Sequence, residues 1–268
     1  MATRKTDPAA SVEISILELQ EQTIKFFLLG NSPMIFNRLS EKAKRELLMP
    51  APKKNQMERA SSLKHEPLQE FRASAHKLKD DNAPTLLAMP AICFKGALRN
   101  AALDIPGAFK SSIGRLTRVT GVETIPGVPG SEYIPIYGIP KVVCSVVRMA
   151  DKDRTPDVRT RAIVERWACE LEVTFMRPQL RDQGIANLLG AAGVIIGVGD
   201  WRQEKGSGSY GLFKVVGNDE AEWKRIVATG GRAVQVAAMD DPEPYNEDTE
   251  ELLAWYDVEL RRRGIKAA

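Results

Sequence analysis

Hydrophobic side chains recur along the chain with two different periods, and each change of period predicts a change between strand and helix. Residues 23–30 are mostly apolar and end at a glycine, as in a buried strand. Residues 137–149 and 160–175 alternate between apolar and polar side chains and are rich in β-branched residues, so both are predicted strands. The charged segment 150–158 separates them, and the three segments together predict a hairpin.

Apolar residues three and four positions apart predict helices at 92–103 and 183–197. A loop rich in glycine follows the second helix and leads into a predicted strand at 211–216. Beyond it the pattern predicts a helix at 220–227, a short strand at 233–237 and a last helix at 247–263.

Two regions lack a clear hydrophobic period. Residues 40–84 are polar and interrupted by prolines, which indicates a surface insertion with short helices at 40–48 and 68–78. Residues 104–137 are rich in glycine and proline and are expected to form a long loop. We therefore expect one α+β domain spanning residues 1–268.

Composition narrows the class of protein. A hydrophobic fraction of 43% supports a core, and no apolar run is long enough to cross a bilayer. The first ten residues lack the apolar region of a signal peptide, so we expect a cytoplasmic protein. Three widely spaced cysteines are expected to be free thiols, and two histidines without a Cys-x-x-Cys motif predict no metal site. We expect no cofactor.

The loop that begins at Gly197 holds the most distinctive chemistry. Its segment 206–211 matches Gly-x-Gly-x-x-Gly, but a helix precedes it and a strand follows, the reverse of a dinucleotide site. Arg202 and Lys205 are suited to phosphate, and Trp201 and Tyr210 to stacking on bases. On composition alone, the loop fits equally well a surface hairpin whose tryptophan belongs to the core.

Other cations fall into three groups. Lys95 and Arg99 are four residues apart and share one face at the start of a predicted helix, where a phosphate would be attracted. Solvated charges on an amphipathic helix are the simpler interpretation of that spacing. The remaining groups are Arg115 and Arg118 in the expected loop, and Lys152, Arg154, Arg159 and Arg161 around the hairpin. Acids crowd residues 240–257, most simply as a solvated face.

The order of these motifs resembles that of the RAMP superfamily, the backbone and guide-processing subunits of CRISPR effector complexes in antiviral defence. Residues 90–99, Pro-Ala-Ile-Cys-Phe-Lys-Gly-Ala-Leu-Arg, resemble the family's Lys-Gly-x-Leu-Arg motif. Residues 197–213 resemble its glycine-rich loop, and the hairpin at 137–175 is similar to the thumb of backbone subunits. The sequence of the glycine loop differs from the usual sequence in the family. This indicates a divergent branch, such as one encoded by a phage or mobile element.

The resemblance implies a ferredoxin-like (RRM-like) βαββαβ core at about 23–216. Its elements would be the predicted strands at 23–30, 137–149, 160–175 and 211–216 and the helices at 92–103 and 183–197. To this core are added the insertion at about 40–84, the thumb at about 137–175 and a C-terminal extension at 217–268.

The resemblance also implies a protein that polymerises as a helical filament along single-stranded RNA, a guide RNA, together with other effector-complex subunits. Residues 31–39 lack the aspartate of RNA-cleaving backbone subunits, so a non-catalytic role is expected. The implied nucleic-acid-binding residues are Lys95, Arg99, Arg115, Arg118, Lys152, Arg154, Arg159, Arg161, Trp201, Arg202, Lys205 and Tyr210.

Three alternatives stay open. One is a phage-type protein that binds or anneals single-stranded DNA on the same fold. Another is a metal-independent endoribonuclease of the same superfamily, for which His65 and His76 are the available histidines. The last is a structural protein that binds no nucleic acid.

Overall fold

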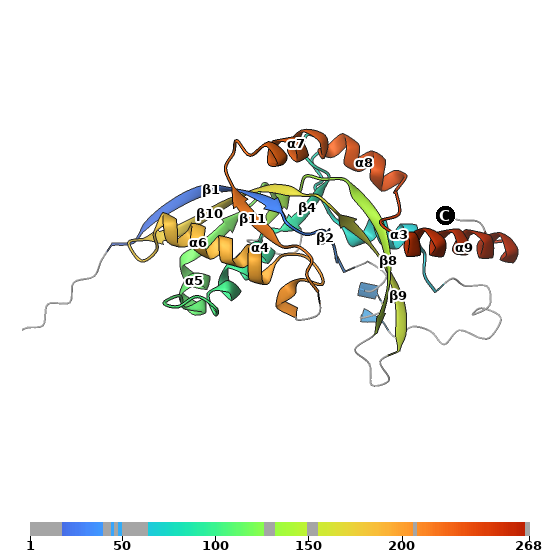
Figure 1. Cartoon of the computed structure of the whole chain (residues 1–268), viewed down its shortest axis with the longest axis horizontal. Helices are drawn as coiled ribbons and strands as arrows, with labels where there is room; N and C mark the ends of the chain where they lie inside the picture. Colours follow the sequence, from blue (N-terminus) through green and yellow to red (C-terminus); the bar gives the residue numbers. More distant parts are fainter. Residues whose placement is uncertain are drawn as a thin grey trace, which may run out of the picture.

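The computed structural model describes residues 18–39, 44–45, 48–49, 64–125, 132–148, 155–205 and 208–265. Within them, no helix has both the length and the apolar character needed to cross a membrane. Figure 1 shows helices on both sides of a central sheet and a long hairpin that extends away from it.

The central sheet has four strands, and each neighbouring pair is antiparallel. They are β1 (Gln20–Gly30), β5 (Thr117–Thr120), β10 (Ala168–Arg177) and β11 (Phe213–Val216), in the order β11-β1-β10-β5. Helix α4 (Ala91–Ala101) precedes β5 along the chain, and α6 (Asp182–Ala191) lies between β10 and β11. A π-helical turn at Ala192–Ile196 extends α6.

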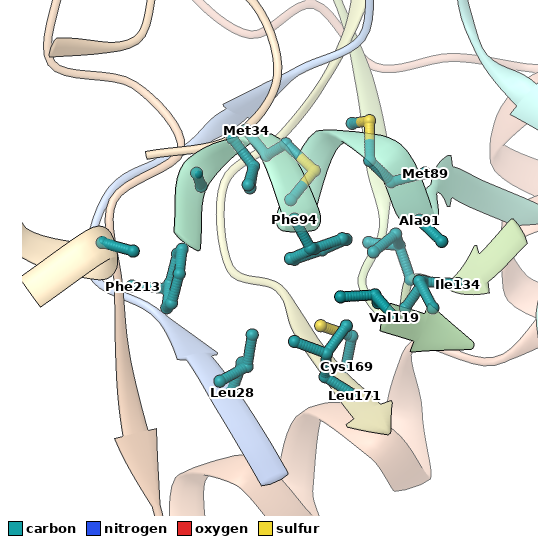
Figure 2. Packing of buried hydrophobic residues seen from close by; sticks show 14 of the residues in the cluster. Leu28, Met34, Met89, Ala91, Phe94, Val119, Ile134, Cys169, Leu171 and Phe213 are labelled. Atoms are coloured by element: carbon teal, nitrogen blue, oxygen red, sulfur yellow. The ribbon is translucent and has the colours of Figure 1, made fainter. Parts of the chain in front are cut away.

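The core lies between this sheet and the helices α4 and α6. Alternate residues of β1 and β10, such as Leu28 and Leu171, point to the same side of the sheet and are fully buried. Phe94 of α4 and Phe213 of β11 meet them with ring centroids 6.5 Å apart (Figure 2). The short helix α5 (Lys110–Leu116) buries Ile113 in the same layer.

The opposite face of the sheet is only partly covered. Helix α7 (Ala221–Thr229) places Trp223 edge-on against Phe27, with centroids 5.0 Å apart. Away from α7 the surface is polar, and Lys25 Nζ lies 3.0 Å from Glu170 Oε2.

Two smaller sheets complete the fold. The hairpin strands β8 (Pro140–Arg148) and β9 (Pro156–Val164) pair with each other, and β9 also pairs with β2 (Met34–Ile35). Helices α3 (Pro67–Ser74) and α9 (Glu247–Arg263) pack at the base of this hairpin (Figure 1). The third sheet has the order β3-β4-β7-β6, with strands His76–Lys77, Leu87–Pro90, Glu132–Pro135 and Glu123–Thr124.

Helix α8 (Arg232–Asp240) is joined to the rest of the chain through a fully buried amide. Gln235 Oε1 accepts hydrogen bonds from the backbone N–H groups of Leu86 and Leu87 at 2.7 and 2.9 Å. Its Nε2 donates to the carbonyl oxygens of Ile136, Gly138 and Gly230 at 2.8, 2.9 and 2.9 Å. Because these partners come from three separate segments, one side chain fixes their relative positions.

An α+β fold was predicted and is confirmed, but three local predictions were wrong. Residues 137–149 and 160–175 are not both strands of the central sheet, because β8 and β9 pair outside it and a bend at 165–167 separates β9 from β10. The expected loop at 104–137 contains α5 and β5. The expected strand at 233–237 belongs to α8, whose buried residues are Gln235 and Met239, whereas the two apolar valines that suggested a strand are exposed.

Candidate nucleic-acid interface

The glycine loop, residues 197–211, is folded tightly on its own backbone. Val198 N–H donates to Gly211 O at 2.9 Å, and Gly211 N–H donates to Pro33 O at 2.7 Å. A Cβ atom on Gly211 would lie 1.7 Å from Val198 O, and one on Gly208 would lie 1.9 Å from Trp201 O. Gly208 and Gly211 are therefore required by the close approach of the chain to itself.

One end of the loop is attached to the hairpin by a buried ion pair. Arg161 of β9 is only 6% exposed, and its Nη1 lies 2.7 Å from Asp200 Oδ2, without full hydrogen-bond geometry. Burial lowers the pKa of Arg161, and the charge of Asp200 opposes that effect. The guanidinium also lies 5.9 Å from the ring centroid of Trp201. The charge of Arg161 is thus engaged within the fold.

The middle of the loop is attached to helix α4. Arg202 Nε donates to Glu204 Oε2 at 2.7 Å, and the Nδ2 of Asn100 on α4 donates to Glu204 Oε1. Burial would raise the pKa of Glu204, but the hydrogen bond and charge of Arg202, with Lys205 and Asn100, outweigh it and hold that pKa below its ordinary value. The loop therefore bridges α4 and the hairpin.

Two aromatic rings lie side by side on this bridge. Trp201 and Tyr210 are both half-buried, with ring centroids 6.2 Å apart and planes inclined by 41°. Trp201 has a φ of 49°, a left-handed conformation that is uncommon outside glycine. Both rings are thus partly exposed and partly packed within the fold.

Four cations on the side of the sheet that carries α4 form no ion pair within the described residues. They are Lys95 and Arg99 of α4, Arg115 of α5 and Lys205 of the glycine loop. Arg99 lies against α5, because its Cδ is 3.0 Å from the position that a Cβ of Gly114 would take. Asp104 is the only acid between residues 91 and 118, and these four cations are here called the basic face.

Sequence reasoning missed one residue near these cations. Phe109 precedes α5, next to Lys110, and is 70% exposed. The sequence feature that could have identified Phe109 is an aromatic side chain inside a segment rich in glycine and proline, where no strand or helix was expected to bury it.

The structure separates other predicted residues from the basic face. Arg118 alternates with the buried Thr117 and Val119 on β5, so it points to the opposite face of the sheet, 3.3 Å from Glu21. Arg159 is exposed on the hairpin. Lys152 and Arg154 lie outside the described residues.

The two histidines are engaged elsewhere. His65 has Nδ1 2.8 Å from Glu70 Oε1 and Nε2 2.9 Å from Asp157 Oδ1. Burial, assisted by the charges of Arg38 and Lys44, lowers the pKa of His76 to about 4. Among the described residues, no group of His, Cys, Asp or Glu side chains is arranged to hold a metal ion.

Comparison with models of known protein families finds no match to this chain. No curated protein is significantly similar to it in sequence either.

Proposed function

We propose that this chain is a non-catalytic protein that binds single-stranded nucleic acid on a ferredoxin-like core. The strand order β11-β1-β10-β5, with α4 and α6 in the two crossovers, supports the fold. In a βαββαβ core, each helix connects two strands that are separated by a third, which gives the spatial order 4-1-3-2. Here β1, β5, β10 and β11 take the first to fourth places. The β8–β9 hairpin projects from this core as a thumb would (Figure 1).

The basic face carries the functional proposal. Its four cations come from three neighbouring segments, because α5 packs on α4 and the glycine loop is hydrogen-bonded to α4. Side chains of a solvated helix usually alternate in sign, whereas none of these four forms an ion pair in the described part of the chain, although the charge of Lys205 acts on Glu204. A phosphate backbone is the ligand that such a row of cations attracts most strongly.

The paired rings of Trp201 and Tyr210 support a single strand over a duplex. Bases of a single strand are free to stack on aromatic side chains, whereas those of a duplex are stacked on each other. Both rings lie on the loop that carries Lys205, so phosphate and base contacts would be adjacent.

The resemblance to RAMP backbone subunits favours guide RNA as the strand and association of successive copies into a helical filament. A heterologous contact that does not close gives such a helix. Single-stranded DNA, bound as by a phage-type annealing protein, is the alternative on the same surface, since phosphates carry no base information.

The test is fluorescence anisotropy with labelled 30-nucleotide RNA and DNA strands over a series of salt concentrations. Replacement of Lys95 and Arg99 by alanine is expected to weaken binding to all sequences alike and to lower the salt slope by roughly 0.7 per lost contact. The matched control replaces Lys224 and Arg225 by alanine. Both are exposed on α7, and their replacement removes the same amount of charge.

Equal losses in the two double variants would reduce the effect to net charge and remove the basic face as the site. Absence of binding by the wild-type chain to either strand at low salt would remove the function. Tighter binding of DNA than of RNA would select the phage-type alternative.

A further inference from the structure

Helix α9 has an inner face that attaches it to the molecule. The hydroxyl of Thr249 accepts a hydrogen bond from Cys144 N–H at 3.1 Å, and the hydroxyl of Tyr256 donates to His65 O at 3.0 Å. Leu260, one turn further, is 4% exposed. These residues are spaced as one side of a helix, so that side packs against the rest of the chain.

The outer face of α9 consists of residues spaced alternately three and four apart: Asp248, Glu251, Trp255, Val258 and Arg262. This is the spacing of a coiled-coil seam. Trp255 and Val258 at its centre are each 63% exposed. A tryptophan exposed to this extent on an ordered helix is unusual, because such residues are normally buried or placed at interfaces.

Charge is distributed along α9 with opposite signs at its two ends. Its first five residues include the acids Glu247, Asp248, Glu250 and Glu251, none of which has an ion-pair partner in the described part of the chain. Its last three residues are arginines. Trp255 is the midpoint, with eight helical residues before it (247–254) and eight after it (256–263).

This arrangement is complementary to itself when one helix is reversed. Two antiparallel copies of α9 with a two-fold axis at Trp255 would place Asp248 opposite Arg262 of the partner subunit. Glu251 would lie beside Val258 of the partner subunit, and the two copies of Trp255 would face each other. Arg262 binds Glu259 of its own helix through Nε and Nη2, which leaves Nη1 available for a second carboxylate.

We propose that two copies of this chain associate through the outer faces of α9 in an antiparallel, two-fold symmetric pair. A contact of this kind is isologous and closes on itself, so it gives a dimer. It uses none of the basic face and requires no nucleic acid. Figure 1 shows α9 at one end of the molecule, beyond the base of the hairpin.

Sedimentation equilibrium of the full chain, freed of nucleic acid, tests the pair. The wild type is expected to show a concentration-dependent monomer–dimer equilibrium. Trp255→Ala is expected to raise the dissociation constant about 30-fold or more, as for a central aromatic residue of an interface. Val194→Ala is the matched control, because Val194 is 59% exposed on the π-helical turn beside α4. Its dissociation constant should equal that of the wild type.

A charge exchange tests the antiparallel geometry. Asp248→Arg and Arg262→Asp should each favour the monomer, since each would place two like charges opposite each other at both ends of the pair. Mixed in equal amounts, the two variants should form a heterodimer, in which both ends regain opposite charges. A wild type that stays monomeric at its highest soluble concentration overturns the proposal, as does a Trp255→Ala variant that dimerises normally. A mixture that stays monomeric overturns it too.

Discussion

Removing Asp200 is expected to destabilise the protein far more than removing an exposed acid. Asp200→Ala leaves the guanidinium of Arg161 buried at 6% exposure without its carboxylate. Breaking a buried pair in this way costs about 3–5 kcal/mol. The side chain of Asp200 is itself 25% exposed, so water can replace part of its role, and we expect a loss of about 2–4 kcal/mol. For a chain of this size that is a fall in melting temperature of roughly 5–15 °C.

The assay is thermal unfolding followed by tryptophan fluorescence, with urea unfolding as a second measure. Glu170→Gln is the matched control, because Glu170 pairs with Lys25 at the surface, where both side chains are more than a third exposed. Such a pair contributes about 0–1 kcal/mol. Arg161→Met combined with Asp200→Ala should cost less than Asp200→Ala alone, since no unpaired charge remains. If Asp200→Ala were as mild as Glu170→Gln, the pair would not anchor the glycine loop.

Three further outcomes are expected. Trp201→Ala should weaken binding of a single strand by about 1–3 kcal/mol if its ring stacks on a base, measured by anisotropy; unchanged binding would leave the ring a structural role. Gly211→Ala should lower the melting temperature by at least about 4 °C, because its Cβ would meet Val198 O and its φ is 70°, whereas Gly96→Ala, with nothing within 4 Å, should be neutral or stabilising. The pKa of His76 is lowered from 6.5 to about 4, so its contribution to stability is present above pH 6.5 and is lost as the pH falls towards 4. In His76→Gln, the free energy of unfolding measured in urea should therefore depend less on pH over that interval. A pH dependence equal to that of the wild type would contradict the burial of the neutral ring.

Long segments with a sustained period were predictable from the sequence, and short ones were not. The run at 23–30 and the helix at 247–263 have enough residues for their periods to be recognised. Strand β5 has four residues in a segment rich in glycine and proline, and it is a strand because Val119 pairs with Val173, more than fifty residues away. No local pattern contains that partner.

In the candidate site too, features set by a local pattern were predictable, and features set by distant residues were not. The sequence placed Lys95 and Arg99 on one helical face, as the structure has them, but the prediction that both lie at the start of the helix was wrong, because Arg99 is in the last turn of α4. Arg159 and Arg161 are two residues apart on one face of β9, and no local pattern distinguishes them. Arg161 differs because Asp200, from a loop thirty-nine residues later, pairs with it. Phe109 was overlooked because the exposure of an aromatic side chain depends on tertiary packing, which the local sequence does not contain.

The bend between β9 and β10 determines how the hairpin base is held. Trp167, fully buried, donates from Nε1 to Ser32 O at 2.9 Å, and a Cβ on Gly30 would lie 2.3 Å from the same nitrogen. The strand leaving the central sheet is thus fixed by an indole that fills the space beside a glycine. A ligand contacting the base of the hairpin would meet a surface that is already ordered, and the entropy lost on association would come mainly from the ligand strand itself. Calorimetry would register this as an unfavourable entropy that grows with the length and flexibility of the strand.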